Sequence, residues 1–379
     1  MVNIEKFKAE EIATENCNPR LDLSNFCTIE RFLEVTSGMN LAERIAGSTE
    51  RYAVWTCRQV LLTREWGIRR CFEGDRVLVG TGFFNLGNTC FLNSTLQALF
   101  HNNDVVKWLE NDFHHRVGCT KDDCITCTLH YLCLDSKSSK SAVAPEKLVS
   151  NLNCFWKDYK INVQQDAQEF LCILFNRLND EFLLRISDEQ VVQEGVNEGP
   201  ISAITEGSFT CEIHCTSCSK ASVTTQPIGL LPLPLEKATK VEDCLQIFFT
   251  PELINEYNCP MCCKTQVAAI KRLKLREPPK VLICYLKRFN ANGTKIFKNI
   301  SVQETLSVSD FMETGTPCNY SMFGSILHGG KRSKIGHYVT VVKNNEKFYQ
   351  FNDSQVQQVT ENELLTNKGY IYFYKLNNN

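Results

Sequence analysis

The chain has 379 residues, of which 43% are hydrophobic and 22% charged, a composition typical of a globular protein with a buried core. Its formal net charge of -2 does not favour a protein that binds nucleic acid through a general basic surface. No apolar run approaches the roughly 20 residues that cross a bilayer, and the charged N-terminal stretch does not resemble a secretory signal. We therefore expect a nuclear or cytoplasmic protein with no direct nucleic-acid or membrane partner.

The 20 cysteines are more informative than the overall composition. In a reducing compartment, clustered cysteines indicate a metal site or catalysis more often than disulfides. Most cysteines of this chain stand alone and are interpreted as small buried apolar residues. Three groups are clustered, and they contain Cys119, Cys124 and Cys127; Cys215 and Cys218; and Cys259, Cys262 and Cys263.

Residues 1–78 contain helix-like stretches but no repeat and no chemical motif. The four cysteines of this region lack ligand spacing and the region has no histidine, so a zinc finger is not expected there. We predict a helical N-terminal extension of unknown role over 1–78, followed by a second domain over 79–379.

The pattern changes from Gly82 onward. Apolar spacing predicts a helix that runs on from Cys90, a second helix near 105–113 and a long amphipathic helix from Gln164. Residues 187–206 are acidic and contain glycine, which predicts an exposed loop. Later segments rich in branched and aromatic residues predict strands of antiparallel type, namely IGLLPLPL, PKVLICYLKRF, YVTVVK, KFYQFND and YIYFYKL. Helices followed by strands indicate an α+β fold.

The stretch GFFNLGNTCFLNSTLQALF places Cys90 at the start of a predicted helix. A thiol attacks as its thiolate, and the N-terminus of a helix stabilises negative charge. Gly82 and Gly87 would let the backbone turn tightly and leave room for a substrate, and Asn85 could direct an amide at a developing oxyanion. A helix capped by Asn88 or Thr89, with a merely buried thiol, is the alternative reading of the same residues.

A nucleophilic cysteine also needs a base and a group that orients the base. His337 precedes a predicted strand, and Asn352 and Asp353 end the next one. Adjacent antiparallel strands could bring Asn352 beside the imidazole of His337 and hold one tautomer. The spacing alone does not show that these strands meet Cys90, and a lone histidine at a strand edge is often only a surface residue.

Six blocks occur in order and together resemble the ubiquitin-specific protease family of deubiquitinating cysteine proteases. The blocks are GFFNLGNTCFLNSTLQALFH, VQQDAQEFL, CTSC…CPMC, PPKVLICYLKRF, GHYVTVV and FYQFNDSQV. The resemblance runs from Gly82 to about Lys375. It implies a papain-like cysteine protease fold with a helical thumb, a β-rich palm and zinc-ribbon fingers at about 207–270.

Carried over by position, the resemblance implies roles for the residues of these blocks. Cys90 matches the nucleophile, His337 the general base and acid, and Asn352 the third member of the triad. Asp353 matches a second polar residue that assists, and Asn85 matches the amide of the oxyanion hole. A sixth residue, Asp166, matches the carboxylate that helps to hold the basic tail of ubiquitin, and Gln168 departs from the family in standing where many relatives carry histidine.

Two cysteine pairs about forty residues apart predict a structural zinc ribbon. The four thiolates of these pairs suit tetrahedral zinc, and the pairs are Cys215 with Cys218 and Cys259 with Cys262. Cys263 offers another register, but Cys262 gives the usual spacing. The resemblance implies that this ribbon is the fingertip that grips ubiquitin.

HHRVGCTKDDCITC predicts a second zinc ion, since His115, Cys119, Cys124 and Cys127 offer one imidazole and three thiolates, with His114 as the alternative to His115. An insertion of this type resembles the branch of the family that works in the SAGA transcriptional co-activator and removes ubiquitin from histone. That branch carries an N-terminal zinc finger for which residues 1–80 lack the ligands.

The sequence therefore predicts a zinc-stabilised thiol isopeptidase that cleaves after the C-terminal glycine of ubiquitin and has ubiquitinated proteins, with co-activator adaptor subunits, as partners. A catalytically silent ubiquitin-binding scaffold and a zinc-ribbon module for nucleic acid are the alternatives from other classes.

Overall fold

The structure is a computed structural model, and it describes residues 72–73, 76–111, 119, 121, 123–188, 198–333, 335–366 and 368–377. The predicted helical extension falls almost wholly outside the described residues and stays a prediction. His114, His115 and residues 189–197 of the predicted acidic loop lie outside them as well. Within the described ranges, none of the helices has both the length and the apolar character needed to cross a bilayer.

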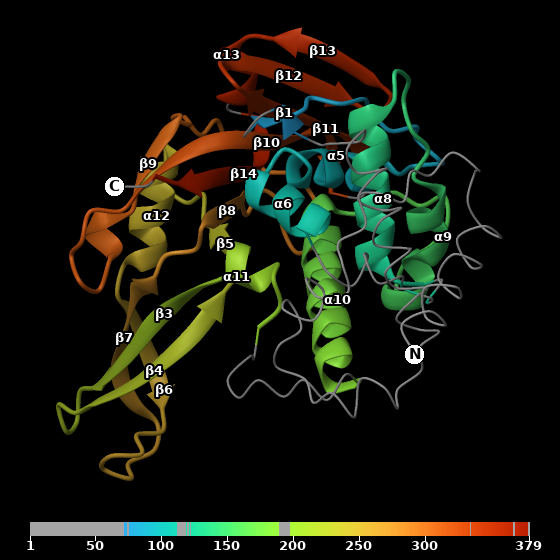
Figure 1. The fold of residues 1–379 in the computed structure, drawn as a ribbon. Coiled ribbons are helices and arrows are strands. Elements are labelled where there is room, and N and C mark those ends of the chain that lie inside the picture. The colour runs from blue at the N-terminus through green and yellow to red at the C-terminus, as the bar shows by residue number, and fades with distance from the viewer. Residues whose placement is uncertain are drawn as a thin grey trace, which may run out of the picture. The chain divides into compact units, whose positions relative to one another are not determined.

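Five helices form the first half of the described chain and lie beside one another (Figure 1). They are α5 (Cys90–Leu99), α6 (Asn103–Asn111), α8 (Ile125–Ser138), α9 (Glu146–Phe155) and α10 (Ala167–Asp188). The helix predicted from Cys90 is confirmed. The long amphipathic helix begins three residues later than Gln164, because the side chain of Asp166 accepts the N–H of Gln168 and so ends the preceding loop.

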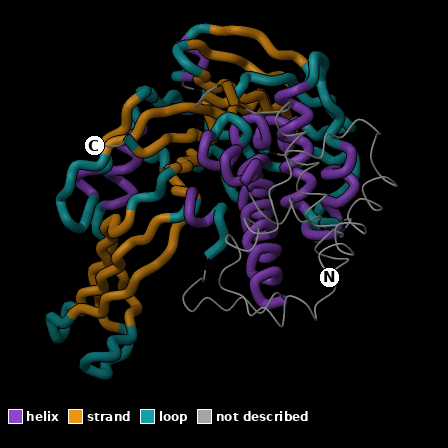
Figure 2. Tube along the Cα trace, in the orientation of Figure 1, coloured by secondary structure: helices purple, strands orange, loops and turns teal. Residues whose placement is uncertain are grey.

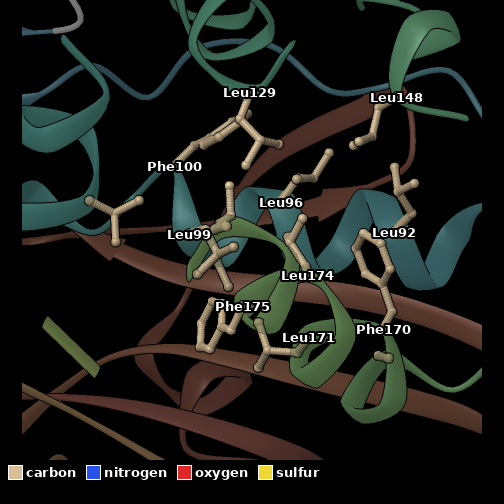
Figure 3. Close-up of a cluster of buried hydrophobic side chains, with 14 of the residues drawn as sticks. Leu92, Leu96, Leu99, Phe100, Leu129, Leu148, Phe170, Leu171, Leu174 and Phe175 are labelled. Carbon is tan, nitrogen blue, oxygen red and sulfur yellow. The ribbon is translucent and has the colours of Figure 1, made fainter. Parts of the chain in front are cut away.

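The core of this helical part lies between α5 and α10. Figure 3 shows side chains of both helices in one cluster, with Leu129 of α8 and Leu148 of α9 beside them. Every residue of α5 is buried, so this helix is enclosed on all sides and cannot shift without disturbing its neighbours. Those labelled from α5 and α10 are Leu92, Leu96, Leu99, Phe170, Leu171, Leu174 and Phe175.

The larger sheet of the described residues has eight strands in the order β13-β12-β11-β10-β14-β8-β5, with β9 paired to β10. Their bounds are β5 (Leu230–Leu233), β8 (Val281–Leu286), β9 (Thr305–Ser307), β10 (Asn319–Arg332), β11 (Ile335–Asn344), β12 (Lys347–Asn352), β13 (Gln355–Val359) and β14 (Gly369–Leu376). These strands confirm the predicted strand segments. One expectation was wrong: β5 pairs with β8 in parallel, because a long connection leaves the sheet and returns between them.

That connection carries β6 and β7, which join the earlier strands β3 and β4 in a four-stranded antiparallel sheet of order β4-β3-β7-β6. This smaller sheet projects away from the larger one (Figures 1 and 2). Its strands are β3 (Gly207–Cys215), β4 (Ala221–Ile228), β6 (Glu252–Tyr257) and β7 (Val267–Glu277), and α12 (Val241–Phe249) lies between β5 and β6 in the chain.

The remaining elements are short. They are the paired strands β1 (Phe72–Glu73) and β2 (Arg76–Val77), helices α11 (Ser202–Thr205) and α13 (Glu361–Leu364), and the 3-10 turn Ser309–Phe311. Helix α11 corrects the last part of the exposed loop predicted over 187–206, since three of its four residues are buried. The α+β fold predicted from the order of helices and strands is confirmed.

Candidate active site

Cys90 is the first residue of α5 and is only 2% exposed. Thr89 precedes it as the N-cap, but the side chain of Thr89 makes no capping hydrogen bond. Its hydroxyl instead accepts the N–H of Leu86 at 2.9 Å, within the loop that leads to the helix. No side-chain cap therefore neutralises the positive end of the helix dipole beside Cys90. Of the two residues considered as caps, Thr89 bonds to Leu86, and Asn88 bonds to Asn162 and Gln164.

His337 lies on β11 and contacts Cys90. A hydrogen bond with Cys90 is the largest cause that raises the pKa of His337 to about 9, burial opposes this shift, and the contact with Asn352 adds to it. The Nε2–H of His337 donates to Oδ1 of Asn352 at 2.6 Å. Because Nε2 is engaged in this way, Nδ1 is the ring nitrogen left to exchange a proton with the thiol.

The antiparallel pairing of β11 with β12 places Asn352 beside His337, as the sequence predicted. The same strand is tied to the helix that carries the thiol, since Thr340 Oγ1 of β11 donates to the carbonyl of Ser94 at 2.6 Å. This bond is buried, so β11 and α5 are held at a fixed distance. The nucleophile, the base and the orienting amide thus come from three elements that pack directly on one another.

Asn85 lies in the loop before α5 with its side chain oriented by hydrogen bonds at both ends. Its Oδ1 accepts the backbone N–H groups of Gly87 and Thr89, each at 3.1 Å. Its Nδ2 donates to Oδ2 of Asp353 at 3.0 Å. The amide nitrogen carries two hydrogens, so a second N–H remains for an oxyanion beside Cys90. The predicted role of Asn85 stays a prediction, and this orientation is compatible with it.

Asp353 joins the β12–β13 turn to the loop that carries Cys90. Its carboxylate accepts Asn85 Nδ2 and, at 2.8 Å, Asn93 Nδ2 of α5, while its backbone carbonyl accepts the N–H of Phe83 at 2.9 Å. Gly82 is required beneath this turn, because a Cβ there would lie 2.3 Å from the carbonyl oxygen of Asp353. The carboxylate therefore supports the nucleophile loop, whereas its neighbour Asn352 supports the base.

Asp166 lies at the start of α10 and is 8% exposed. Its Oδ1 accepts the Gln168 N–H at 2.8 Å and the Tyr370 hydroxyl at 2.9 Å. Burial raises the pKa of Asp166, and these donors partly oppose that shift. A contact with the basic tail of ubiquitin, as the resemblance implies, would therefore use the other oxygen. Gln168 points elsewhere and contacts the sulfur of Cys172.

The four thiols predicted to form a zinc ribbon lie together at the end of the smaller sheet. The sulfur atoms of Cys215, Cys218, Cys259 and Cys262 all lie within 4.8 Å of one another. Each pair sits in a tight turn: Cys215 N–H donates to the carbonyl of Lys220 at 3.0 Å, and Cys259 N–H to that of Lys264 at 2.9 Å. Cys263 is exposed and outside the group, so the usual spacing through Cys262 is the register adopted. Four convergent sulfur donors fit a structural metal ion.

The second cluster contains Cys119, Cys124 and Cys127, with sulfur atoms also within 4.8 Å of one another. Cys124 is the N-cap of α8. The histidine predicted as the fourth ligand, whether His115 or His114, lies outside the described residues. Three thiols at this separation are a donor set that a divalent metal ion could use.

Three functional candidates were not found from the sequence. Asn93 donates to the carboxylate of Asp353, and Gln164 accepts the backbone N–H of Gly336. Asparagine and glutamine are common in helices and loops, so their residue type does not indicate these roles. Glu181 of α10 is a buried carboxylate that accepts the N–H groups of Ile125 and Thr126 at 2.8 and 2.9 Å, and so caps α8 beside Cys124. Glu181 could have been found from the sequence, because a charged residue among the apolar positions of a helix indicates a buried carboxylate that needs hydrogen-bond donors.

Residues 81–374 match the family described as ubiquitin carboxyl-terminal hydrolase. The proteins named ubiquitin carboxyl-terminal hydrolase 36 of Drosophila grimshawi and Drosophila simulans are each 32% identical to this chain over 316 and 311 residues, or 79% of it. These alignments cover 25% and 31% of the two relatives. The chain thus spans about a quarter to a third of the length of the curated relatives it matches.

The fold is similar to that of solved SAGA DUB modules. The yeast SAGA DUBm with an Sgf73 mutant gives a TM-score of 0.68 at 27% identity, covering 79% of this chain and 68% of that one. The SAGA Ubp8/Sgf11/Sus1/Sgf73 DUB module bound to ubiquitin aldehyde gives 0.69 at 25% identity, covering 84% and 75%. The predicted papain-like fold is confirmed: the helices are its thumb, the larger sheet its palm and the smaller sheet its fingers.

Proposed function

This chain belongs to the ubiquitin carboxyl-terminal hydrolase family, and we propose that it is a cysteine-type deubiquitinase that hydrolyses the isopeptide bond after the C-terminal glycine of ubiquitin. The observation that carries this proposal is His337, which contacts Cys90 on one side and donates to Asn352 on the other. A thiol, a base and an orienting amide in one line are the minimum set for nucleophilic catalysis by cysteine.

In the first half of the reaction, Nδ1 of His337 takes the proton of the Cys90 thiol, and the thiolate attacks the carbonyl carbon of the terminal glycine. The backbone N–H of Cys90 and the second N–H of Asn85 stabilise the oxyanion. The imidazolium then donates its proton to the leaving lysine amine, and a thioester remains on Cys90.

In the second half, His337 accepts a proton from water, and the resulting hydroxide attacks the thioester. The tetrahedral intermediate collapses with release of the ubiquitin carboxylate, and the proton returns to the sulfur. Asn352 stabilises the ring as imidazolium in both halves, because its Oδ1 accepts from Nε2 throughout.

Both metal sites are proposed to hold structural zinc, giving two ions per chain. The ribbon would be held by Cys215, Cys218, Cys259 and Cys262, and the second ion by Cys119, Cys124 and Cys127 with His115 or His114. Zinc bound by four protein ligands supplies no open position for catalysis, and it stabilises the turns that carry its ligands.

A role in a transcriptional co-activator is proposed for the biological setting. One solved structure of similar fold is a SAGA DUB module assembled from Ubp8, Sgf11, Sus1 and Sgf73, with ubiquitin aldehyde bound. For the present chain we therefore propose ubiquitinated protein, including monoubiquitinated histone, as substrate, adaptor subunits as partners, and a nuclear or cytoplasmic location.

The test is to mix the purified chain with ubiquitin that carries a thiol-reactive group at its C-terminus and to measure the intact mass. A one-ubiquitin adduct that is absent with Cys90→Ala is expected, with the fold of the variant checked by its melting temperature. Binding of ubiquitin without an adduct would contradict the enzyme and favour a ubiquitin-binding scaffold. A salt-sensitive gain of DNA binding in place of ubiquitin binding would favour the nucleic-acid module instead.

A further inference from the structure

The segment just before α10 touches both halves of the catalytic centre. On the nucleophile side, Asn88 Nδ2 donates to the carbonyl of Asn162 at 2.6 Å, and Gln164 Nε2 donates to Oδ1 of Asn88 at 3.4 Å. On the base side, the backbone N–H of Gly336 donates to Oε1 of Gln164 at 2.7 Å. Asn88 lies two residues before Cys90 and Gly336 one residue before His337, so one side chain spans from one catalytic loop to the other.

The bond to Gly336 is the stronger of the two by its geometry. Its 2.7 Å length is at the short end for an N–H donor, whereas 3.4 Å to Asn88 is long. Gly336 is also confined from its other side, because a Cβ there would lie 2.4 Å from both Gly329 O and His328 Nε2. The backbone that leads into His337 is thus fixed between β10 and the side chain of Gln164.

The nucleophile loop needs such external support because its backbone is strained. Asn88 has φ 61°, in the left-handed region that is unfavourable for a residue with a side chain, whereas Gly87 adopts its φ of 95° without that cost. A Cβ on Gly87 would lie 2.3 Å from Oδ1 of Asn162, which shows how closely the two segments approach. Contacts from the segment over 162–164 therefore hold the loop in the conformation that precedes Cys90.

We propose that Gln164 is a positioning residue that sets the alignment of the Cys90 thiol with the His337 ring. This inference deepens the proposed function and rests on it, since it assigns a role in the same reaction. The two hydrogen bonds of the Gln164 side chain go to Asn88 and to the Gly336 N–H, so its effect on the thiol and the ring passes through the segments that precede Cys90 and His337. Loss of the side chain should therefore affect the rate of the chemical step and leave the binding of ubiquitin unchanged.

The experiment compares the wild-type chain of 379 residues with Gln164→Ala and Gln164→Glu. For Gln164→Ala we expect kcat on a ubiquitin–fluorophore conjugate to fall about ten- to hundredfold with an unchanged KM, because small misplacements of reacting groups have costs of that order. Gln164→Glu retains an acceptor for the Gly336 N–H and should recover part of the loss. Gln357→Ala is the matched control, since it removes only an exposed bond to Gln350 on the β12–β13 hairpin.

The second readout is the rate at which iodoacetamide alkylates Cys90, measured as a function of pH by peptide mass spectrometry. Because the His337 ring contacts the thiol, the wild type should be alkylated faster than His337→Gln, which serves as the reference without the base. In Gln164→Ala the profile should move towards that of His337→Gln, whereas Gln357→Ala should retain the wild-type profile.

A Gln164→Ala protein with wild-type alkylation and wild-type kcat would overturn the inference, as would a rise in KM alone. A higher kcat would also overturn it, because the hydrogen bonds of Gln164 would then hold the site in a less active arrangement. If the wild type hydrolyses no ubiquitin conjugate but its alkylation profile still depends on Gln164, the proposed function fails and the positioning role stands.

Discussion

Replacement of Asp353 by alanine tests whether this carboxylate acts through the amide of Asn85. The variant removes a hydrogen bond of 3.0 Å from Asn85 and one of 2.8 Å from Asn93. A hydrogen bond to a charged group contributes about 1.5–3 kcal/mol, and if that energy holds Asn85 in place, its loss corresponds to an about ten- to hundredfold lower kcat. Asn93 keeps longer contacts to two backbone carbonyls, so the free energy of unfolding should fall by only about 1–2 kcal/mol.

The assay is a double-mutant cycle with hydrolysis of a ubiquitin–fluorophore conjugate. Asn85→Ala alone should lower kcat by about 10²–10³, the usual cost of one oxyanion donor. The double variant should be no slower than Asn85→Ala, because both changes act through one amide. Losses that multiply in the double variant would refute this reasoning and give Asp353 an effect on catalysis independent of Asn85.

Three further predictions concern pH, metal and backbone fit. Because the pKa of His337 is raised from 6.5 to about 9, stabilisation by its protonated ring is complete below pH 6.5 and lost as the pH rises through 9. Urea melts should show that the difference in unfolding free energy between the wild type and His337→Gln shrinks across that window. A difference that stays constant with pH would contradict this prediction. Cys218→Ser should release one of the two proposed zinc ions, measured by elemental analysis, and lower the melting temperature. Cys263→Ser, which changes an exposed neighbour outside the cluster, should do neither. Gly82→Ala should lower both stability and kcat, since its Cβ would strike the backbone of Asp353, while Gly229→Ala, with its nearest contact at 3.4 Å, should leave both unchanged.

The local elements and the chemistry-bearing residues could be predicted from the sequence because each has a local signal. Apolar periodicity marked α5, and the paired C-x-x-C spacing marked the ribbon cysteines, which the structure brings together. The parallel pairing of β5 with β8 has no such signal, because it is decided by where the chain returns after building the smaller sheet. The late start of α10 follows from one side chain, Asp166, whose capping bond competes with helix extension.

The side-chain network around the catalytic residues could not be predicted, since its partners are far apart in the chain. Asn93 and Asp353 are separated by 260 residues, and Gly336 and Gln164 by 172. Glutamine and asparagine have many ordinary positions in helices and loops, so their residue type alone does not indicate a role. Only the packing of β11 and the β12–β13 turn against α5 brings these groups within hydrogen-bonding distance.

The different partners of Asn352 and Asp353 have a backbone cause. Asn352 ends β12 and directs its side chain at His337, whereas Asp353 begins the turn with φ 49°, in the left-handed region that aspartate tolerates better than most residues. That rotation turns the second side chain away from His337 and towards Asn85 and Asn93. Asn352 thus supports the base, and Asp353 supports the nucleophile loop. A residue substituted at 353 must therefore both adopt a positive φ and carry the negative charge that accepts from Asn85 and Asn93. Asp353→Asn retains the conformation and loses the charge, and its kcat should therefore lie between those of the wild type and Asp353→Ala.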